Sequence, residues 1–232
     1  LIPLGIKAFY KDSAIQARLE AASIAGLGSE AWNDSPTLVD LLEFFSTKYI
    51  TLGYEDEFVD KALNHIRLRL QYWLASSIGK AIGFPSTFNT DAKLITFALT
   101  NIQSEKEAEI LGLSAYMAAS RQSLSSQNSA FFMDEASVLL KFVSLSRLVG
   151  RKCATARKQG SRVILAGQDA DSIAESEAGE QILQNMPLRL IGRIVPGASQ
   201  SYVDTLGIQK SIITENESFE PNVRESYTRW LL

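Results

Sequence analysis

The spacing of apolar residues changes part-way along the chain. Up to about residue 90, apolar positions recur every three or four residues, which is typical of amphipathic helices. The clearest case is residues 56–78, whose predicted buried stripe contains Phe58, Ala62, Ile66, Leu70 and Trp73. In the segment "NDSPTLVDLLEFF", Asp34 or Ser35 is the expected N-cap, with Pro36 in the first helical turn. We therefore predict an all-helical subdomain over residues 1–90.

After the turn-rich segment "IGFPSTFNTD" (82–91), short apolar runs alternate with helical patterns. Strands are predicted at residues 93–99, 130–133, 162–166 and 188–195. Helices are predicted after a capping box formed by Ser104 and Glu107, from about Ser137 to Lys158, and over residues 172–185. Strands separated by helices indicate a parallel sheet with right-handed crossovers. Residues 91–232 are therefore predicted to form an α/β core, with helices on both faces of a parallel sheet.

Composition narrows the functional class. The 232 residues are 46% hydrophobic and 21% charged, as in ordinary globular proteins, and the net charge of −3 gives no general attraction for nucleic acid. The one cysteine, Cys153, excludes an internal disulfide and is expected to be a buried structural thiol. No apolar run approaches the ~20 residues of a membrane span.

An Asp–Glu pair follows the strand predicted at residues 130–133. Ligands of open parallel sheets bind at the carboxyl ends of the strands, which is where Asp134 and Glu135 are expected. Hydrolysis of a nucleoside triphosphate uses this layout, since one carboxylate holds Mg²⁺ while its neighbour orients or deprotonates the attacking water. The alternative is a solvated helix N-terminus, where carboxylates interact favourably with the helix dipole.

A glutamine ends the next predicted strand. The segment "RVILAGQ" places Gln168 at a carboxyl strand end, close to Glu135 if the two strands are neighbours. Its amide both donates and accepts hydrogen bonds, so it could sense a γ-phosphate or position water. The alternative is a polar strand-end residue that faces solvent.

A basic stretch lies between these two motifs. From Lys141 to Arg162 there are seven basic residues and no acidic one. Arg147, Arg151 and Lys158 fall near one helical face, which could meet a DNA backbone or the nucleotide of a neighbouring subunit. The alternative is a solvated face that pairs with the acidic stretch from Asp169 to Glu180.

Three segments carry a family resemblance: "FFMDEASVLL", "ARKQGSRVILAGQDADSI" and "AGEQILQN". They resemble the large conjugation ATPases of type IV secretion systems, the TraC/TrbE kind, which belong to the P-loop branch that also holds hexameric DNA translocases. The matching positions are Asp134, Glu135, Ala136, Arg157, Lys158, Gly160, Gln168, Gly179, Ile182, Leu183 and Asn185. The helical insertion, "LQYWLASSIGKAIGF" and "KLITFAL" are similar to the family's preceding segment, so the resemblance spans nearly the whole chain.

The resemblance implies a P-loop (RecA-like) fold that binds ATP and Mg²⁺. Asp134 would hold the metal, Glu135 would act as base and Gln168 would contact the γ-phosphate. Arg151 or Arg157 would stabilise charge in the transition state. The family further implies a homo-oligomer, with a hexamer as one form. It also implies a cytoplasmic location, peripheral to the inner membrane through type IV secretion components.

The phosphate loop is where the chain departs from the family. No segment fits G-x-x-x-x-G-K-[ST], and "GKA" at Gly79–Ala81 lacks the hydroxyl residue that Mg²⁺ requires. The family's loop precedes the helical insertion, so it would fall before Leu1. Ser137 also departs, since the family often has a larger residue there. We therefore expect the carboxyl-terminal part of a longer ATPase, inactive alone. The alternatives are a DNA translocase or helicase of the same branch, and a non-catalytic interaction module whose Asp–Glu pair caps a helix.

Overall fold

The computed structural model of the chain describes residues 1–52, 57–85, 92–99, 104–125, 128–218 and 230–232. The chain divides into two compact units, Leu1–Ile95 and Thr96–Leu232. Within the described ranges, no helix combines the length and apolar character needed to cross a membrane.

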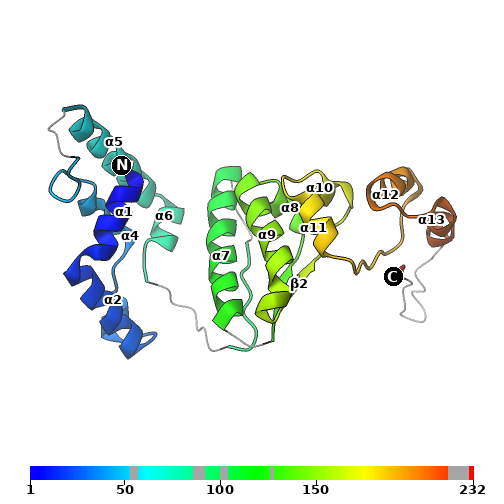
Figure 1. Cartoon of the computed structure of the whole chain (residues 1–232), viewed down its shortest axis with the longest axis horizontal. Coiled ribbons are helices and arrows are strands. Elements are labelled where there is room, and N and C mark those ends of the chain that lie inside the picture. Colours follow the sequence, from blue (N-terminus) through cyan, green and yellow to red (C-terminus); the bar gives the residue numbers. More distant parts are fainter. Residues whose placement is uncertain (53–56, 86–91, 100–103, 126–127, 219–229) are drawn as a thin grey trace. The chain divides into compact units, whose positions relative to one another are not determined.

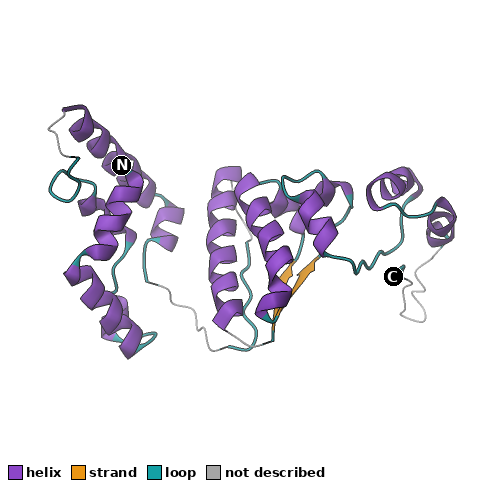
Figure 2. Ribbon diagram, in the orientation of Figure 1, coloured by secondary structure: helices purple, strands orange, loops and turns teal. Residues whose placement is uncertain are grey.

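The described residues of the first unit form helices and loops only (Figure 2). The helices are α1 (Ile2–Lys11), α2 (Ser13–Ala25), α3 (Glu30–Asn33), α4 (Leu38–Leu41), α5 (Glu57–Leu74) and α6 (Ser77–Ile82), with a 3-10 turn at Leu42–Phe44. Two small apolar clusters hold them together. One centres on Phe9 and Phe44, and the other on Phe45 and Leu63. Helices this short are stabilised chiefly by such packing.

The N-cap predicted at Asp34 or Ser35 is wrong. Thr37 caps α4, and Asp40 completes a capping box by accepting the backbone N–H of Thr37 at 2.7 Å. The Asp34 carboxylate instead lies 3.4 Å from the Arg18 Nε, and the Asp34 backbone carbonyl accepts the Nε–H of Arg18 at 2.9 Å. Arg18 also donates to Asp40 at 2.7 Å. Pro36 therefore precedes the helix rather than starting it.

The helix predicted over residues 56–78 is divided. It ends at Leu74 as α5, and Ser76 starts α6 by accepting the N–H of Gly79 at 3.1 Å, since a serine hydroxyl satisfies a free N–H at a helix start. The buried side of α5 centres on Leu63, which is 1% exposed. Phe58, predicted to be buried, is 75% exposed.

The second unit contains the sheet. Its elements are α7 (Glu105–Ser125), β1 (Ser129–Met133), α8 (Ala136–Leu140), α9 (Val143–Thr155), β2 (Ser161–Leu165), α10 (Asp171–Ala174), α11 (Gly179–Asn185), α12 (Ser199–Leu206) and α13 (Lys210–Glu217), with 3-10 turns at Ala156–Gln159 and Pro196–Ala198 (Figure 1). β1 and β2 pair in parallel, with Ser129 opposite Ser161 and Met133 opposite Leu165. The α/β class and the parallel pairing of these two strands are confirmed.

Two predicted helices are also divided. The helix predicted from Ser137 to Lys158 becomes α8 and α9, because Phe142 between them has an extended backbone (φ −82°, ψ 117°). The helix predicted over residues 172–185 becomes α10 and α11. Each break turns the chain so that consecutive short helices can both contact the core.

The sheet is covered on one face among the described residues. On that face Phe131 and Met133 of β1 are each 7% exposed and pack with Leu145 of α9 and Tyr116 of α7. Alternate strand residues point to the other face, where Phe132 and Ile164 lie opposite each other and are 60% and 49% exposed. The expected helices are thus found on one face of β1–β2, and the other face is open.

The strands predicted at residues 93–99 and 188–195 do not form. Residues 93–99 have no regular structure. In the second segment Ile191 forms only an isolated antiparallel bridge with Leu231. The fully buried side chain of Asn216 bonds two further backbone groups of this segment, because it accepts from Ile194 N–H at 2.7 Å and donates to the Gly192 carbonyl at 3.0 Å. A side chain therefore takes the place of a neighbouring strand.

Two ionisable residues of α9 are buried below β1. Lys152 is 5% exposed, donates to the Ser123 hydroxyl and lies 5.9 Å from the centre of the Phe131 ring. It forms no ion pair within the described part of the chain, and its burial lowers the pKa of the ammonium. Cys153 lies 3.8 Å from the Met186 sulfur, and burial raises the pKa of its thiol to about 11, as expected for an inert structural cysteine.

Replacing Lys152 by Met is expected to stabilise the protein at neutral pH. The lowered pKa means that the folded state binds the Lys152 proton less tightly than the unfolded state does. The charged ammonium therefore destabilises the fold at pH 7, and this loss diminishes as the pH rises toward the ordinary lysine value near 10.5. Urea denaturation of both proteins between pH 7 and pH 10 measures the difference. A gap in unfolding free energy that widens with pH would contradict this account.

Candidate functional site

The Asp–Glu pair lies directly after β1, and both residues are exposed. Glu135 has φ 46° and ψ 44°, in the left-handed region, and Asn128 is the other described non-glycine residue with a positive φ. This conformation costs an L-residue about 1–2 kcal/mol. The surrounding structure must therefore hold Glu135 in place.

Two backbone hydrogen bonds provide that support. Ala166, the residue after β2, donates its N–H to the Met133 carbonyl at 2.9 Å. The Ala166 carbonyl accepts the N–H of Ala136 at 2.7 Å. The chain after β2 is thus bonded on both sides of Asp134–Glu135. Gln168, which is exposed, follows two residues after Ala166, so the structure brings these three residues to the same edge of the sheet.

Neither carboxylate of the pair caps α8. Glu135 occupies the N-cap position, but its side chain accepts no capping hydrogen bond. Asp134 accepts the N–H of Glu135 at 3.0 Å, and the first N–H of α8, that of Ala136, is bonded to Ala166 instead. Capping does not explain why two carboxylates stand here. Their exposed oxygens are suited to a hydrated Mg²⁺ ion and a water molecule.

The loop after Gln168 is tied to α12. Asp169 accepts the N–H of Ser172 at 2.7 Å at the start of α10. Asp171 accepts the Thr205 hydroxyl at 2.6 Å, and hydrogen bonds from Ser201 and Thr205 lower the pKa of Asp171. Both carboxylates are already bonded to protein groups. This link was missed from the sequence because Asp171 and Thr205 lie 34 residues apart with no motif to join them.

The basic stretch does not form one continuous face. Arg147 on α9 forms an ion pair with Glu177 at 2.6 Å, as the alternative of pairing with the acidic stretch requires. Arg151, one turn later, lines an open depression with residues of α9 and α11 and of the turn before α11: Arg147, Glu177, Ala178, Glu180 and Gln181. Lys158 lies outside α9, in the 3-10 turn Ala156–Gln159.

Arg157 lies at the opposite end of β2 from Gln168. It belongs to the 3-10 turn that reaches β2 through Gly160, whose φ of 68° favours glycine. β2 has five residues, and at about 3.3 Å per residue they separate its ends by roughly 13 Å or more. Within one chain, Arg157 is therefore separated from Asp134, Glu135 and Gln168 by the length of the strand.

The "AGEQILQN" segment has a packing role. Ala178 donates its N–H to the buried Ser146 hydroxyl at 2.9 Å, which joins α11 to α9. A Cβ added at Gly179 would lie 2.0 Å from the Ala174 carbonyl oxygen, so only glycine fits. Ile182 is 1% exposed in the core beneath β1. Among the described residues, no group of three or more metal-ligating side chains is present.

Comparison with known proteins identifies the fold. No protein-family model matches the chain, and no curated protein matches it by sequence. Among solved structures, VirB4 of Thermoanaerobacter pseudethanolicus superposes with a TM-score of 0.62 at 12% sequence identity. The match covers 94% of this chain and 62% of the VirB4 chain. The fold is similar to that of VirB4.

Similarity to VirB4, a type IV secretion ATPase, confirms at the level of the fold the resemblance that the sequence motifs indicate. The chain spans less than two thirds of the VirB4 chain that it matches. At 12% identity the likeness concerns the fold alone. Roles for individual residues therefore rest on the geometry of this chain.

Proposed function

We propose that this chain is the carboxyl-terminal part of an ATPase domain that energises type IV secretion or conjugative DNA transfer by hydrolysing MgATP. The observation that carries the proposal is the Asp134–Glu135 pair, held after β1 beside the end of β2 with no helix-capping bond to explain it. Backbone strain of this kind concentrates at functional sites.

Each residue at this edge receives a defined role. Asp134 orients water around Mg²⁺, and its bond from the Glu135 N–H fixes one of its oxygens. Glu135 takes a proton from the attacking water. Gln168 lies on the loop that the Ala166–Met133 bond joins to β1, and contacts the γ-phosphate there. Bound Mg²⁺ would neutralise charge that develops on the phosphate oxygens.

The open face of the sheet supports completion by a further segment. Phe132 and Ile164 are large apolar side chains exposed side by side, and in the described residues β2 has no neighbour on its outer edge. A strand added to that edge, followed by a helix over the face, would cover both. We propose that this segment carries the phosphate loop, which cradles the phosphates in P-loop proteins.

The arginines fit an oligomer. Because Arg157 lies at the far end of β2, we propose that it acts on the nucleotide of a neighbouring subunit, as a trans arginine; Arg151 is the other candidate. The oligomer, which we propose to be a hexamer, would work in the cytoplasm, at the inner membrane through secretion components. Lys158 lies outside α9, so Arg147, Arg151 and Lys158 do not form a single helical face for a DNA backbone.

The 232-residue chain alone is expected to show no ATP hydrolysis above background. The same chain preceded by its phosphate-loop segment should hydrolyse MgATP at about 1 s⁻¹ or faster, the low end of ordinary enzyme rates. A coupled ATPase assay on both proteins makes the comparison. Turnover near ~1 s⁻¹ by the 232-residue chain would show that no external phosphate loop is needed.

A further inference from the structure

The first unit has an uneven distribution of charge. From Lys61 to Thr90 there is no acidic residue, and four basic residues occur: Lys61, Arg67, Arg69 and Lys80. The other residues of the unit Leu1–Ile95 comprise eleven acidic and five basic ones. The cationic residues therefore gather on α5 and α6, within a unit that is otherwise acidic.

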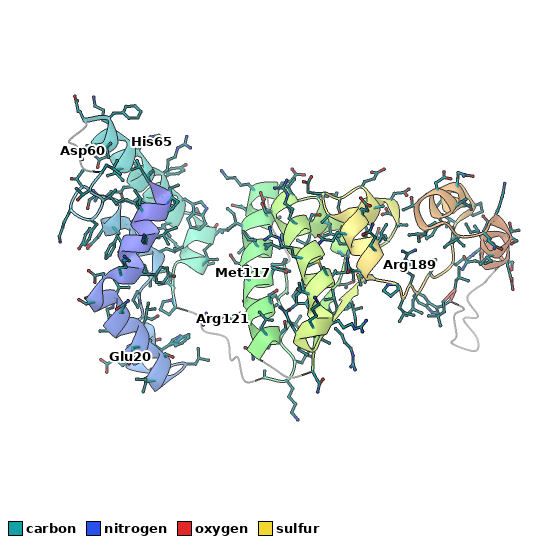
Figure 3. The ribbon with its side chains drawn as sticks, in the orientation of Figure 1. Glu20, Asp60, His65, Met117, Arg121 and Arg189 are labelled. Atoms are coloured by element: carbon teal, nitrogen blue, oxygen red, sulfur yellow. The ribbon has the colours of Figure 1, made fainter. Side chains whose placement is uncertain are left out.

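These cations share the surface of α5 with exposed apolar side chains. Leu63 and its neighbours face the core, and the outer side of α5 presents Tyr72, which is 86% exposed, and Leu68, which is 64% exposed. We define the α5 strip as Lys61, His65, Leu68, Arg69 and Tyr72, which share the outward face of the helix at 3.6 residues per turn. His65 is labelled on α5 in Figure 3.

The charges of the α5 strip are available to a partner. Arg69 is exposed and forms no ion pair or side-chain hydrogen bond within the residues that the structure describes. Lys61 pairs with Glu57 one turn away, at 2.7 Å, but both side chains are more than two thirds exposed. Such a pair contributes little and exchanges readily for another anion.

The combination of positive charge and an exposed aromatic ring on the α5 strip indicates the chemical class of its partner. Unpaired cations in an otherwise acidic unit are complementary to a polyanion. A tyrosine that stands almost fully in solvent beside an arginine provides a stacking surface for a base, and bases are accessible for stacking in single strands. A duplex would meet the cations but would leave Tyr72 and Leu68 without a partner surface.

We propose that the α5 strip binds single-stranded nucleic acid, with Arg69 and Lys61 on phosphates and Tyr72 stacked on a base. This proposal does not depend on nucleotide hydrolysis. The strip lies on α5, in the unit Leu1–Ile95, whereas Asp134, Glu135 and Gln168 belong to the unit Thr96–Leu232.

The test is fluorescence anisotropy of the 232-residue chain with labelled oligodeoxythymidylate of 20 nucleotides. With two phosphate contacts, raising salt fourfold should weaken binding by about sevenfold. Lys61→Glu together with Arg69→Glu should weaken binding by at least about tenfold at low salt. Tyr72→Ala should weaken it by about fivefold or more with a smaller change in salt dependence, since stacking is not ionic.

The matched control is Lys7→Glu together with Lys11→Glu on α1. It changes the net charge of the same unit by the same amount at exposed positions away from α5, and binding should remain within about twofold of the unchanged chain. Thermal melting confirms folding of every variant. Equal losses in the α1 and α5 variants, tighter binding to a duplex of the same length, or full retention of binding by Tyr72→Ala would each overturn the proposal. A uridylate oligomer distinguishes RNA from DNA as the preferred strand.

Discussion

Replacing Glu135 by Gln is expected to reduce ATP hydrolysis by about 10²–10⁴-fold in a protein that carries the complete ATPase domain. Glutamine keeps the shape and most hydrogen bonding of glutamate but cannot accept a proton from the attacking water. The side chain of Glu135 makes no capping bond, so little stability should be lost. Nucleotide binding, measured by fluorescence of a labelled ATP analogue, should remain within about twofold, because the phosphate contacts are unchanged.

Asp134→Ala provides the contrast. Removing the proposed metal-holding carboxylate should weaken Mg²⁺-dependent nucleotide binding itself, whereas Glu135→Gln should leave binding intact. If the pair served only to cap α8, both changes would instead cost about 0.5–2 kcal/mol of stability and spare turnover. Melting temperature and ATPase rate, measured in parallel on both variants, distinguish the two roles. Hydrolysis that survives Glu135→Gln would show that Glu135 is not the base.

Leu145→Ala is expected to lower the free energy of unfolding of the second unit by about 3–5 kcal/mol. Leu145 is 0% exposed and lies in the core that supports β1, so truncation leaves a cavity that the surrounding helices cannot fill. Urea denaturation followed by circular dichroism measures the loss. Because this core supports β1 and the turn after it, the change should also impair nucleotide binding in the complete domain.

Leu124→Ala is the matched control for this change. It removes the same atoms from α7 of the same unit at a side chain that is 54% exposed, so the cost should be below about 1 kcal/mol. Equal costs at the two positions would mean that α9 does not pack beneath β1 in solution.

The elements that the sequence predicted well have local causes. β1 and β2 are short apolar runs bounded by turn residues, and the helices between them indicate parallel pairing. The placement of Asp134, Glu135 and Gln168 followed from strand direction, since parallel strands bring their carboxyl ends to one edge of the sheet.

The elements that the sequence predicted poorly depend on distant residues. Residues 188–195 have the pattern of a strand, but a strand needs a neighbour, and here Asn216 and Leu231 bond Ile191, Gly192 and Ile194 instead. α4 is capped by Thr37, whose capping-box partner Asp40 is bound by Arg18 from another helix, and Arg18 also pairs with Asp34. Neither partner is visible in a local window of sequence.

The separation between Arg157 and the Asp–Glu pair could have been predicted from the sequence. Arg157 precedes β2 and Gln168 follows it, so the direction of one strand is sufficient to put them at opposite edges. The motif resemblance grouped Arg157 and Gln168 by their roles and did not use the direction of β2. The left-handed backbone of Glu135 could not be predicted in this way, because it is held by hydrogen bonds with Ala166, a residue 31 positions later in the chain.

The separation of Arg157 from Asp134 and Glu135 has a consequence for mixed assemblies. In a closed ring under the proposed function, every subunit contributes Arg157 to the nucleotide site of one neighbour. At its other interface it binds a nucleotide that is contacted by the arginine of the second neighbour. A subunit that lacks only Glu135 or only Arg157 would inactivate the nucleotide site at one subunit interface, and a subunit that lacks both would inactivate the sites at two interfaces. Co-assembled rings would then lose activity in proportion to the number of defective interfaces, not of defective subunits. A Glu135 variant and an Arg157 variant, each inactive alone, would regain turnover together at the interfaces that combine the intact Glu135 of one with the intact Arg157 of the other.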